Sequence, residues 1–264
     1  SIEYAEKCFQ EAQEIQDLDL MAPVARDLTS AYMFAGEFAK AVPIFSTVIP
    51  LIEKANKRSE SFGRPASVYT FLCGLAGFIM SYLGSYKEAE DLCEKAFVNA
   101  SHNNDLYELA YSEYSYGVVA FAKGDGRSIV EHLKKCVNYI EQSQMTTLMD
   151  TTLAVLGWGY VHRGDLEKAR EFAESALKAA GQPGAASGNA LPTQATLAQI
   201  YIEMGDLEKA YLCATEAVKM SKGRMVGGWE GMACLVMGRV LARMGEPRHE
   251  EAEEYVKKAL MILK

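Results

Sequence analysis

Gly164-Asp165-Leu166-Glu167-Lys168-Ala169 is repeated unchanged 41 residues later as Gly205-Asp206-Leu207-Glu208-Lys209-Ala210. Looser copies are Gly36-Glu37-Phe38-Ala39-Lys40-Ala41 and Gly84-Ser85-Tyr86-Lys87-Glu88-Ala89. Six glycines in all recur at spacings of 48, 40, 40, 41 and 40 residues: Gly36, Gly84, Gly124, Gly164, Gly205 and Gly245. A regular period of this length indicates a chain of stacked units, each a supersecondary motif.

The residues around these glycines follow one scheme. The residue seven positions earlier is small in every unit: Thr29, Gly77, Gly117, Gly157, Ala198 and Gly238. A glycine just past a helix adopts the left-handed conformation without steric cost, and an acidic neighbour can cap the next helix. Small residues let two antiparallel helices approach closely. The scheme therefore predicts one helical hairpin per unit, with a core formed by stacking the hairpins.

These small-residue, glycine and alanine positions resemble the tetratricopeptide repeat family, over nearly the whole chain. The usual period of that family is about 34 residues, whereas the period here is mostly 40. Extended repeats of this kind resemble the C-terminal regions of bacterial signal-transduction ATPases and class III adenylate or guanylate cyclases. The resemblance implies an all-α fold, a right-handed α-solenoid of about six hairpins plus a leading helix.

We expect a single solenoid domain over residues 1–264, with the leading helix at 2–16. The expected repeats are approximately 22–56, 66–101, 105–143, 146–180, 191–221 and 229–264. The chain opens half-way through a unit and closes on an apolar helix end, whereas solenoids need polar caps. We therefore expect a fragment of a larger protein, or ends that another subunit covers.

Two irregularities lead to further expectations. Ile129 stands where the family has alanine, which predicts a splayed third hairpin because the larger side chain holds its helices apart. The glycine-rich connections at 181–190 and 222–228 are the expected hinges of the solenoid.

Composition excludes several classes of protein. The net charge of −8 argues against non-specific binding to nucleic acid, which needs a basic face. No segment reaches the roughly 20 apolar residues that span a bilayer, so we expect no membrane partner. Six scattered cysteines without a C-x-x-C motif favour a reduced, cytoplasmic location.

The sequence shows no catalytic motif. None of the four histidines is paired with another histidine or a cysteine at metal-ligand spacing. Phosphate-binding and nucleophile-elbow motifs are missing from the sequence as well. We therefore expect no enzyme activity, no metal and no cofactor.

The resemblance implies that the first helix of each hairpin lines a concave groove. The candidate partner-binding residues are Phe71, Phe78, Tyr82, Tyr111, Tyr114, Phe121, Trp158, His162, Gln199, Arg239 and Arg243. The same mapping places Arg26, Ser30, Met33 and Phe34 of the first unit there. Aromatic and arginine side chains are common interface anchors, so the groove suits a peptide with apolar side chains and an acidic end. Alternatively, the longer helices shift the register and several of these aromatics belong to the core.

Two specialised forms of the family fit less well. The carboxylate clamp for chaperone tails needs lysine and asparagine where this chain has Gly74 and Phe78. Receptors for peptide pheromones use groove asparagines, whereas Asn56, Asn99, Asn103, Asn104, Asn138 and Asn189 all map elsewhere.

The function that follows is a non-catalytic module of a cytosolic signalling or regulatory protein, which binds a protein or peptide segment in the groove. One alternative is a ligand-sensing regulatory domain that changes the shape of the superhelix when it binds a small molecule or peptide. Another is an oligomerisation scaffold, in which the apolar solenoid ends pair as a homo-oligomer.

Overall fold

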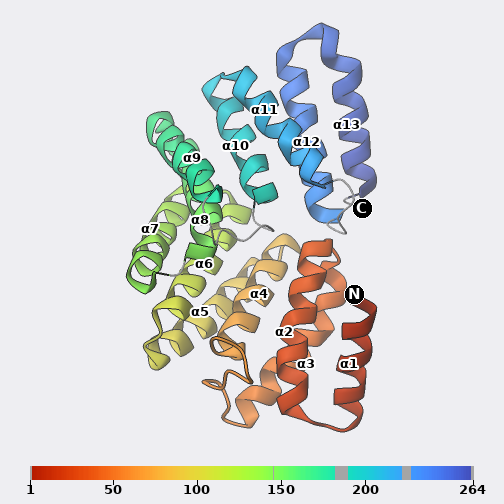
Figure 1. The fold of residues 1–264 in the computed structure, drawn as a ribbon, viewed down its shortest axis with the longest axis vertical. Coiled ribbons are helices and arrows are strands. Elements are labelled where there is room, and N and C mark those ends of the chain that lie inside the picture. Colours follow the sequence, from red (N-terminus) through yellow and green to blue (C-terminus); the bar gives the residue numbers. More distant parts are fainter. Residues whose placement is uncertain (1, 145, 182–189, 222–226, 263–264) are drawn as a thin grey trace.

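The computed structural model describes residues 2–144, 146–181, 190–221 and 227–262, and within these ranges the fold is all-α (Figure 1). Its α-helices are α1 (Ile2–Glu14), α2 (Leu18–Ala35), α3 (Phe38–Lys54), α4 (Val68–Tyr82), α5 (Tyr86–Asn103), α6 (Leu106–Lys123), α7 (Gly126–Ser143), α8 (Met149–His162), α9 (Leu166–Ala180), α10 (Ala190–Met204), α11 (Leu207–Ser221), α12 (Gly227–Met244) and α13 (His249–Ile262).

The helices from α2 onward pair as consecutive hairpins, and α1 packs against α2. The even-numbered helices also contact one another in order from α2 to α12, so they form a continuous inner layer. Because α12 contacts α2, this layer closes on itself and the first and last hairpins meet (Figure 1). The fold is the predicted solenoid of helical hairpins with a leading helix.

The turn chemistry is as predicted. All six repeat glycines have a positive φ, between 72° and 104°. At the helix start that follows, the carboxylates of Asp125, Asp165 and Asp206 accept hydrogen bonds from backbone N–H groups two or three residues later. Each turn thus ends one helix and caps the next within a few residues.

The small residues allow the two helices of a hairpin to touch. A Cβ atom added to Gly77 would lie 2.9 Å from the sulfur of Cys93 and 3.0 Å from the carbonyl oxygen of Ala89. At Gly238 it would lie 3.0 Å from the carbonyl oxygen of Ala252. Any larger side chain at these two positions would push the helices of the hairpin apart.

The third hairpin is not splayed as expected. Among the described helices, α6 and α7 share the most extensive contact of any pair. Ile129 is fully buried, and a Cβ added to Gly159 of α8 would lie 2.6 Å from its Cγ2 atom. The next repeat therefore accommodates the extra bulk of Ile129, because it has a glycine opposite that side chain.

Most of both expected hinges, residues 182–189 and 222–226, lies outside the described residues. Of the helices that are described, none combines the length and the apolar character needed to cross a membrane.

Candidate functional site

A pocket of about 390 Å³ lies inside the layer of even-numbered helices. All six of these helices contribute to its lining, from α2 at one end of the solenoid to α12 at the other. Eight of the predicted partner-binding residues line it: Phe71, Phe78, Tyr111, Tyr114, Phe121, Trp158, Gln199 and Arg239. The structure thus brings together side chains that are up to 168 residues apart in sequence.

Helical spacing explains why these side chains converge. On α4, Phe71, Gly74 and Phe78 follow one another at intervals of three and four residues, which places them on one face. The same intervals separate Tyr111, Tyr114, Val118 and Phe121 on α6, although they are not all equally buried. Neighbouring inner helices therefore present one aromatic stripe each to the same space.

The deepest part of the wall is an aromatic stack. The rings of Phe71 and Tyr111 lie 4.0 Å apart at 22°, and both side chains are buried. A Cβ on Gly74 would lie 2.6 Å from both the Tyr111 ring and the Ser115 hydroxyl. Glycine at this position is thus what allows α4 and α6 to approach, and the stack is as much core as pocket.

Other aromatic side chains are partly exposed and are available for contact. Phe78, Tyr114, Phe121 and Trp158 are half-buried and pack against the edges of the hydrophobic core. Burial raises the pKa of Tyr114 to about 12, while a hydrogen bond with Thr151 acts in the opposite direction. The phenol is therefore neutral at physiological pH, and the middle of the pocket carries no charge.

Three predicted residues lie outside the lining: Tyr82, His162 and Arg243. Each is four residues, about 6 Å along the helix axis, beyond a residue that lines the pocket. Tyr82 stacks on Phe78 at 4.7 Å, and the exposed His162 lies edge-on to Trp158 at 5.3 Å. They are one helical turn from residues that line the pocket, and this turn extends past the pocket.

Sequence reasoning also missed lining residues. Met232 and Leu235 of α12 line the pocket, and they lie seven and four residues before Arg239. The signal was present, because these positions relative to the turn glycine are those of Phe71 and Gly74 in α4.

The asparagines stand apart from the pocket, as mapped. None of those in the described part of the chain lines it, and Asn189 lies outside that part. Asn103 instead donates to the buried carboxylate of Glu108, and Asn99 donates to Thr70, which itself donates to Glu108. These asparagines hold α4, α5 and α6 together.

Two arginines are the only charged residues in the described lining, Arg26 on α2 and Arg239 on α12. The guanidinium of Arg26 lies 5.2 Å from the centre of the Phe71 ring and 2.9 Å from the carboxylate of Asp27. Arg239 faces Glu203 at 3.5 Å and is about half exposed. Both charges are thus at the pocket surface rather than buried in the core.

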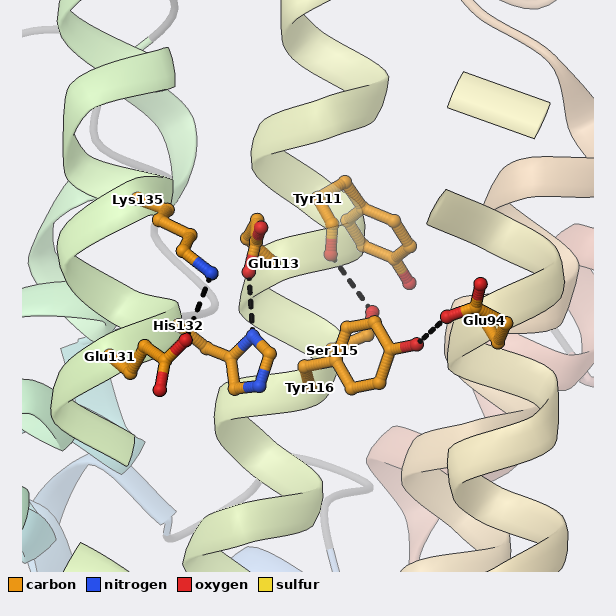
Figure 2. Close-up of polar contacts among 8 residues, drawn as sticks. All are labelled: Glu94, Tyr111, Glu113, Ser115, Tyr116, Glu131, His132 and Lys135. Carbon is orange, nitrogen blue, oxygen red and sulfur yellow. Dashed lines mark hydrogen bonds and ion pairs between the residues drawn. The ribbon is translucent and has the colours of Figure 1, made fainter. Parts of the chain in front are cut away.

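A second pocket, of about 350 Å³, lies on another side of α6, between α5 and α7. Its lining is mostly polar and charged, and Figure 2 shows the partners of its Tyr116 and His132 side chains. The Tyr116 hydroxyl donates to Glu94 at 2.6 Å, and Nδ1 of His132 lies 2.7 Å from the carboxylate of Glu113. Lys123 pairs with Glu90. Neither in this pocket nor in the rest of the described residues do three or more His, Cys, Asp or Glu side chains form a group that could hold a metal ion.

A family model matches residues 75–264, which is about 72% of the chain; its description is MalT-like TPR region. The chain belongs to this family. Membership in the MalT-like TPR regions agrees with the extended repeats and with the resemblance to signal-transduction ATPases. No curated protein sequence matches the chain.

Solved structures share the solenoid of the MalT-like TPR region at low sequence identity. A Rap protein complexed with Competence and Sporulation Factor matches with a TM-score of 0.74 and 13% identity, over 99% of this chain and 69% of that one. The apo form of RapI matches with a TM-score of 0.68 and 9% identity, over 99% and 97%. NprR in complex with its cognate peptide NprX matches with a TM-score of 0.64 and 14% identity, over 98% and 73%. At these identities the likeness concerns the fold alone.

Proposed function

We propose that the chain is a non-catalytic peptide-binding module of a cytosolic signalling protein, and that its central pocket binds a short segment with apolar side chains. The observation that carries the proposal is the pocket itself, which all six inner helices line and to which α2, α4, α6 and α8 contribute partly exposed aromatic side chains. Concave apolar sites with a few polar groups are the usual form of a ligand site. Free, mostly buried cysteines fit a reduced location.

The size of the pocket limits the segment. A volume of about 390 Å³ is at the lower end of the range for ligand pockets, so a few residues fill it and a folded partner domain does not. Half-buried aromatics such as Trp158 and Phe78 offer large apolar areas at little entropic cost on binding. Two of the similar structures, the Rap protein and NprR, were solved as complexes with Competence and Sporulation Factor and with the peptide NprX.

One polar group in the lining suits a peptide backbone. The side-chain oxygen of Gln199 is buried and accepts no hydrogen bond from the described residues. An unsatisfied buried acceptor is unfavourable, and an N–H group of a bound peptide would satisfy it after a small rotation of the amide. Gln199 therefore offers a polar contact within a mostly apolar lining.

Binding of a fluorescent library of N-acetylated tetrapeptides tests the proposal. We expect saturable binding that Trp158→Ala weakens at least tenfold, because Trp158 is an anchor in the pocket. Tyr4→Ala is the matched control, since Tyr4 is an aromatic residue of α1, 73% exposed and outside the pocket. No binding by the library, or equal losses from both variants while their folds remain intact, would overturn the peptide proposal.

A ligand-sensing role is a second candidate, favoured by the contact between α2 and α12. A ligand that touches both helices links the two ends of the superhelix and can shift its closure. Small-angle scattering with and without bound peptide tests this role. A radius of gyration that does not change at saturation would rule out sensing through superhelix shape but leave peptide binding intact.

A further inference from the structure

The charges in the central pocket are of one sign. Among the described residues its lining includes Arg26 and Arg239 but no aspartate or glutamate. The whole chain, by contrast, has a net charge of −8. A cationic lining in an acidic protein favours anionic ligands over neutral ones, because the field inside the pocket differs from that of the surrounding surface.

The neighbouring carboxylates do not neutralise these cations fully. Asp27 accepts from Arg26, and it also forms an ion pair with Arg64, so two guanidinium groups share one carboxylate. Glu203 faces Arg239 at 3.5 Å, which is a long ion pair between two partly exposed side chains. Pairs of this kind are weak and can exchange for a better placed anion.

The two arginines lie on helices that meet. Arg26 is on α2 and Arg239 is on α12, and these helices contact each other where the inner layer closes. The Phe71 ring supports the Arg26 guanidinium at 5.2 Å, so that charge is held at the wall. The aromatic part of the pocket, with Phe78 and Trp158, is formed by the intervening helices.

We infer that the segment bound in this pocket ends in a free carboxylate, held by Arg239 of α12, while Arg26 of α2 adds to the positive charge of the same lining. The inference rests on the proposed function and names the chemistry of the ligand. Guanidinium groups bind carboxylates through paired, charge-assisted hydrogen bonds, which are stronger than those between neutral groups. The apolar side chains of the same segment then occupy the aromatic wall.

Two libraries of N-acetylated tetrapeptides, one with a free C-terminal carboxylate and one with a C-terminal amide, test the inference. Acetylation removes the opposite terminal charge, so the libraries differ only in the group under test. We expect the free acids to bind at least tenfold more tightly than the amides. Equal binding of the two libraries would overturn the inference and leave the proposed function standing.

Variants assign the effect to its residue. Arg239→Gln should reduce acid binding to the level of the amides and leave amide binding unchanged, and Arg26→Gln should act in the same direction. Arg243→Gln is the matched control, because it removes an equal charge from the same helix outside the pocket lining. We expect it to change acid binding less than twofold. An equal loss from Arg243→Gln and Arg239→Gln would mean that only long-range charge acts, and would overturn the inference.

Decanoate and decanamide separate failure of the inference from failure of the proposed function. If neither peptide library binds but decanoate binds in an Arg239-dependent manner and decanamide does not, the carboxylate site stands and the peptide proposal fails. If neither peptides nor decanoate bind, both are overturned.

Discussion

Two pockets share α6: the central pocket inside the layer of even-numbered helices, here the inner pocket, and the polar pocket between α5 and α7, here the outer pocket. Their volumes are similar, about 390 and 350 Å³, but their chemistry differs. In the outer pocket several polar groups already have partners, such as His132 with Glu113 and Tyr116 with Glu94. In the inner pocket the side-chain oxygen of Gln199 has none among the described residues, and Arg239 has only a distant one. The difference teaches that satisfied polar groups hold helices together, whereas unsatisfied ones beside apolar surface are available for a ligand.

Narrowing the inner pocket should have the largest effect on stability and should also weaken peptide binding. Gly74→Ala places a methyl group 2.6 Å from the Tyr111 ring, so Tyr111 or α6 must move. We expect a loss of about 2–3 kcal/mol in the free energy of unfolding, measured by urea denaturation, together with weaker peptide binding. Gly84→Ala, which strains a positive φ of 82° but meets no neighbour, should cost about 1–2 kcal/mol and leave binding unchanged. Unaltered binding by Gly74→Ala would show that the pocket does not depend on this wall.

A substitution in the outer pocket should lower stability but leave peptide binding nearly unchanged. His132→Ala leaves the Glu113 carboxylate, which is 3% exposed, without its histidine partner. A hydrogen bond to a charged group contributes roughly 1.5–3 kcal/mol, so we expect a stability loss of about 2 kcal/mol. Peptide affinity should change less than twofold. The double variant His132→Ala, Glu113→Leu should lose less unfolding free energy than the two single variants together. Strictly additive losses would show that His132 and Glu113 do not stabilise each other.

Alkaline titration compares a phenol of each pocket. Burial raises the pKa of Tyr114 to about 12, and burial together with the nearby Glu94 raises the pKa of Tyr116. A raised pKa in the folded state means that stability is intact below pH 10 and falls as the pH rises toward the folded value. Tyr114→Phe should therefore reduce the slope of unfolding free energy against pH between 10 and 12, by up to about one proton. A slope identical to wild type would contradict the burial of this phenol.

The smallest expected effect on stability sharpens the role of Gln199. Gln199→Leu removes an acceptor that has no partner among the described residues, so the free energy of unfolding should stay the same or rise by up to about 1 kcal/mol. Tetrapeptide binding should weaken at least threefold in the same variant. A clear loss of stability with full binding would mean that Gln199 is structural.

Local features of the solenoid were predictable because they repeat. The turn glycines need a positive φ and the aspartates cap a helix start within three residues, so each can be recognised from neighbouring sequence. The same register placed Phe78 and Trp158 in the pocket lining. Tyr82, in the same register, lies beyond the lining, because a helical register describes a face but not where along the axis a pocket ends.

Particular side-chain contacts between helices were not predictable. Gly159 of the fourth hairpin faces Ile129 of the third, so neither residue alone indicates that the two helices of the third hairpin pack closely. His132 showed no partner in the sequence, because Glu113 lies 19 residues earlier on the other helix of the same hairpin. Such pairs depend on how the helices pack against one another, and one sequence contains no periodic signal for them.

A crystal structure of the chain with the tightest-binding tetrapeptide tests the central claim most directly. We predict that the peptide lies in the inner pocket, in contact with Phe78 and Trp158, with its carboxylate toward Arg239. A peptide bound at the outer pocket near His132, or on the outside of the solenoid, would contradict the account.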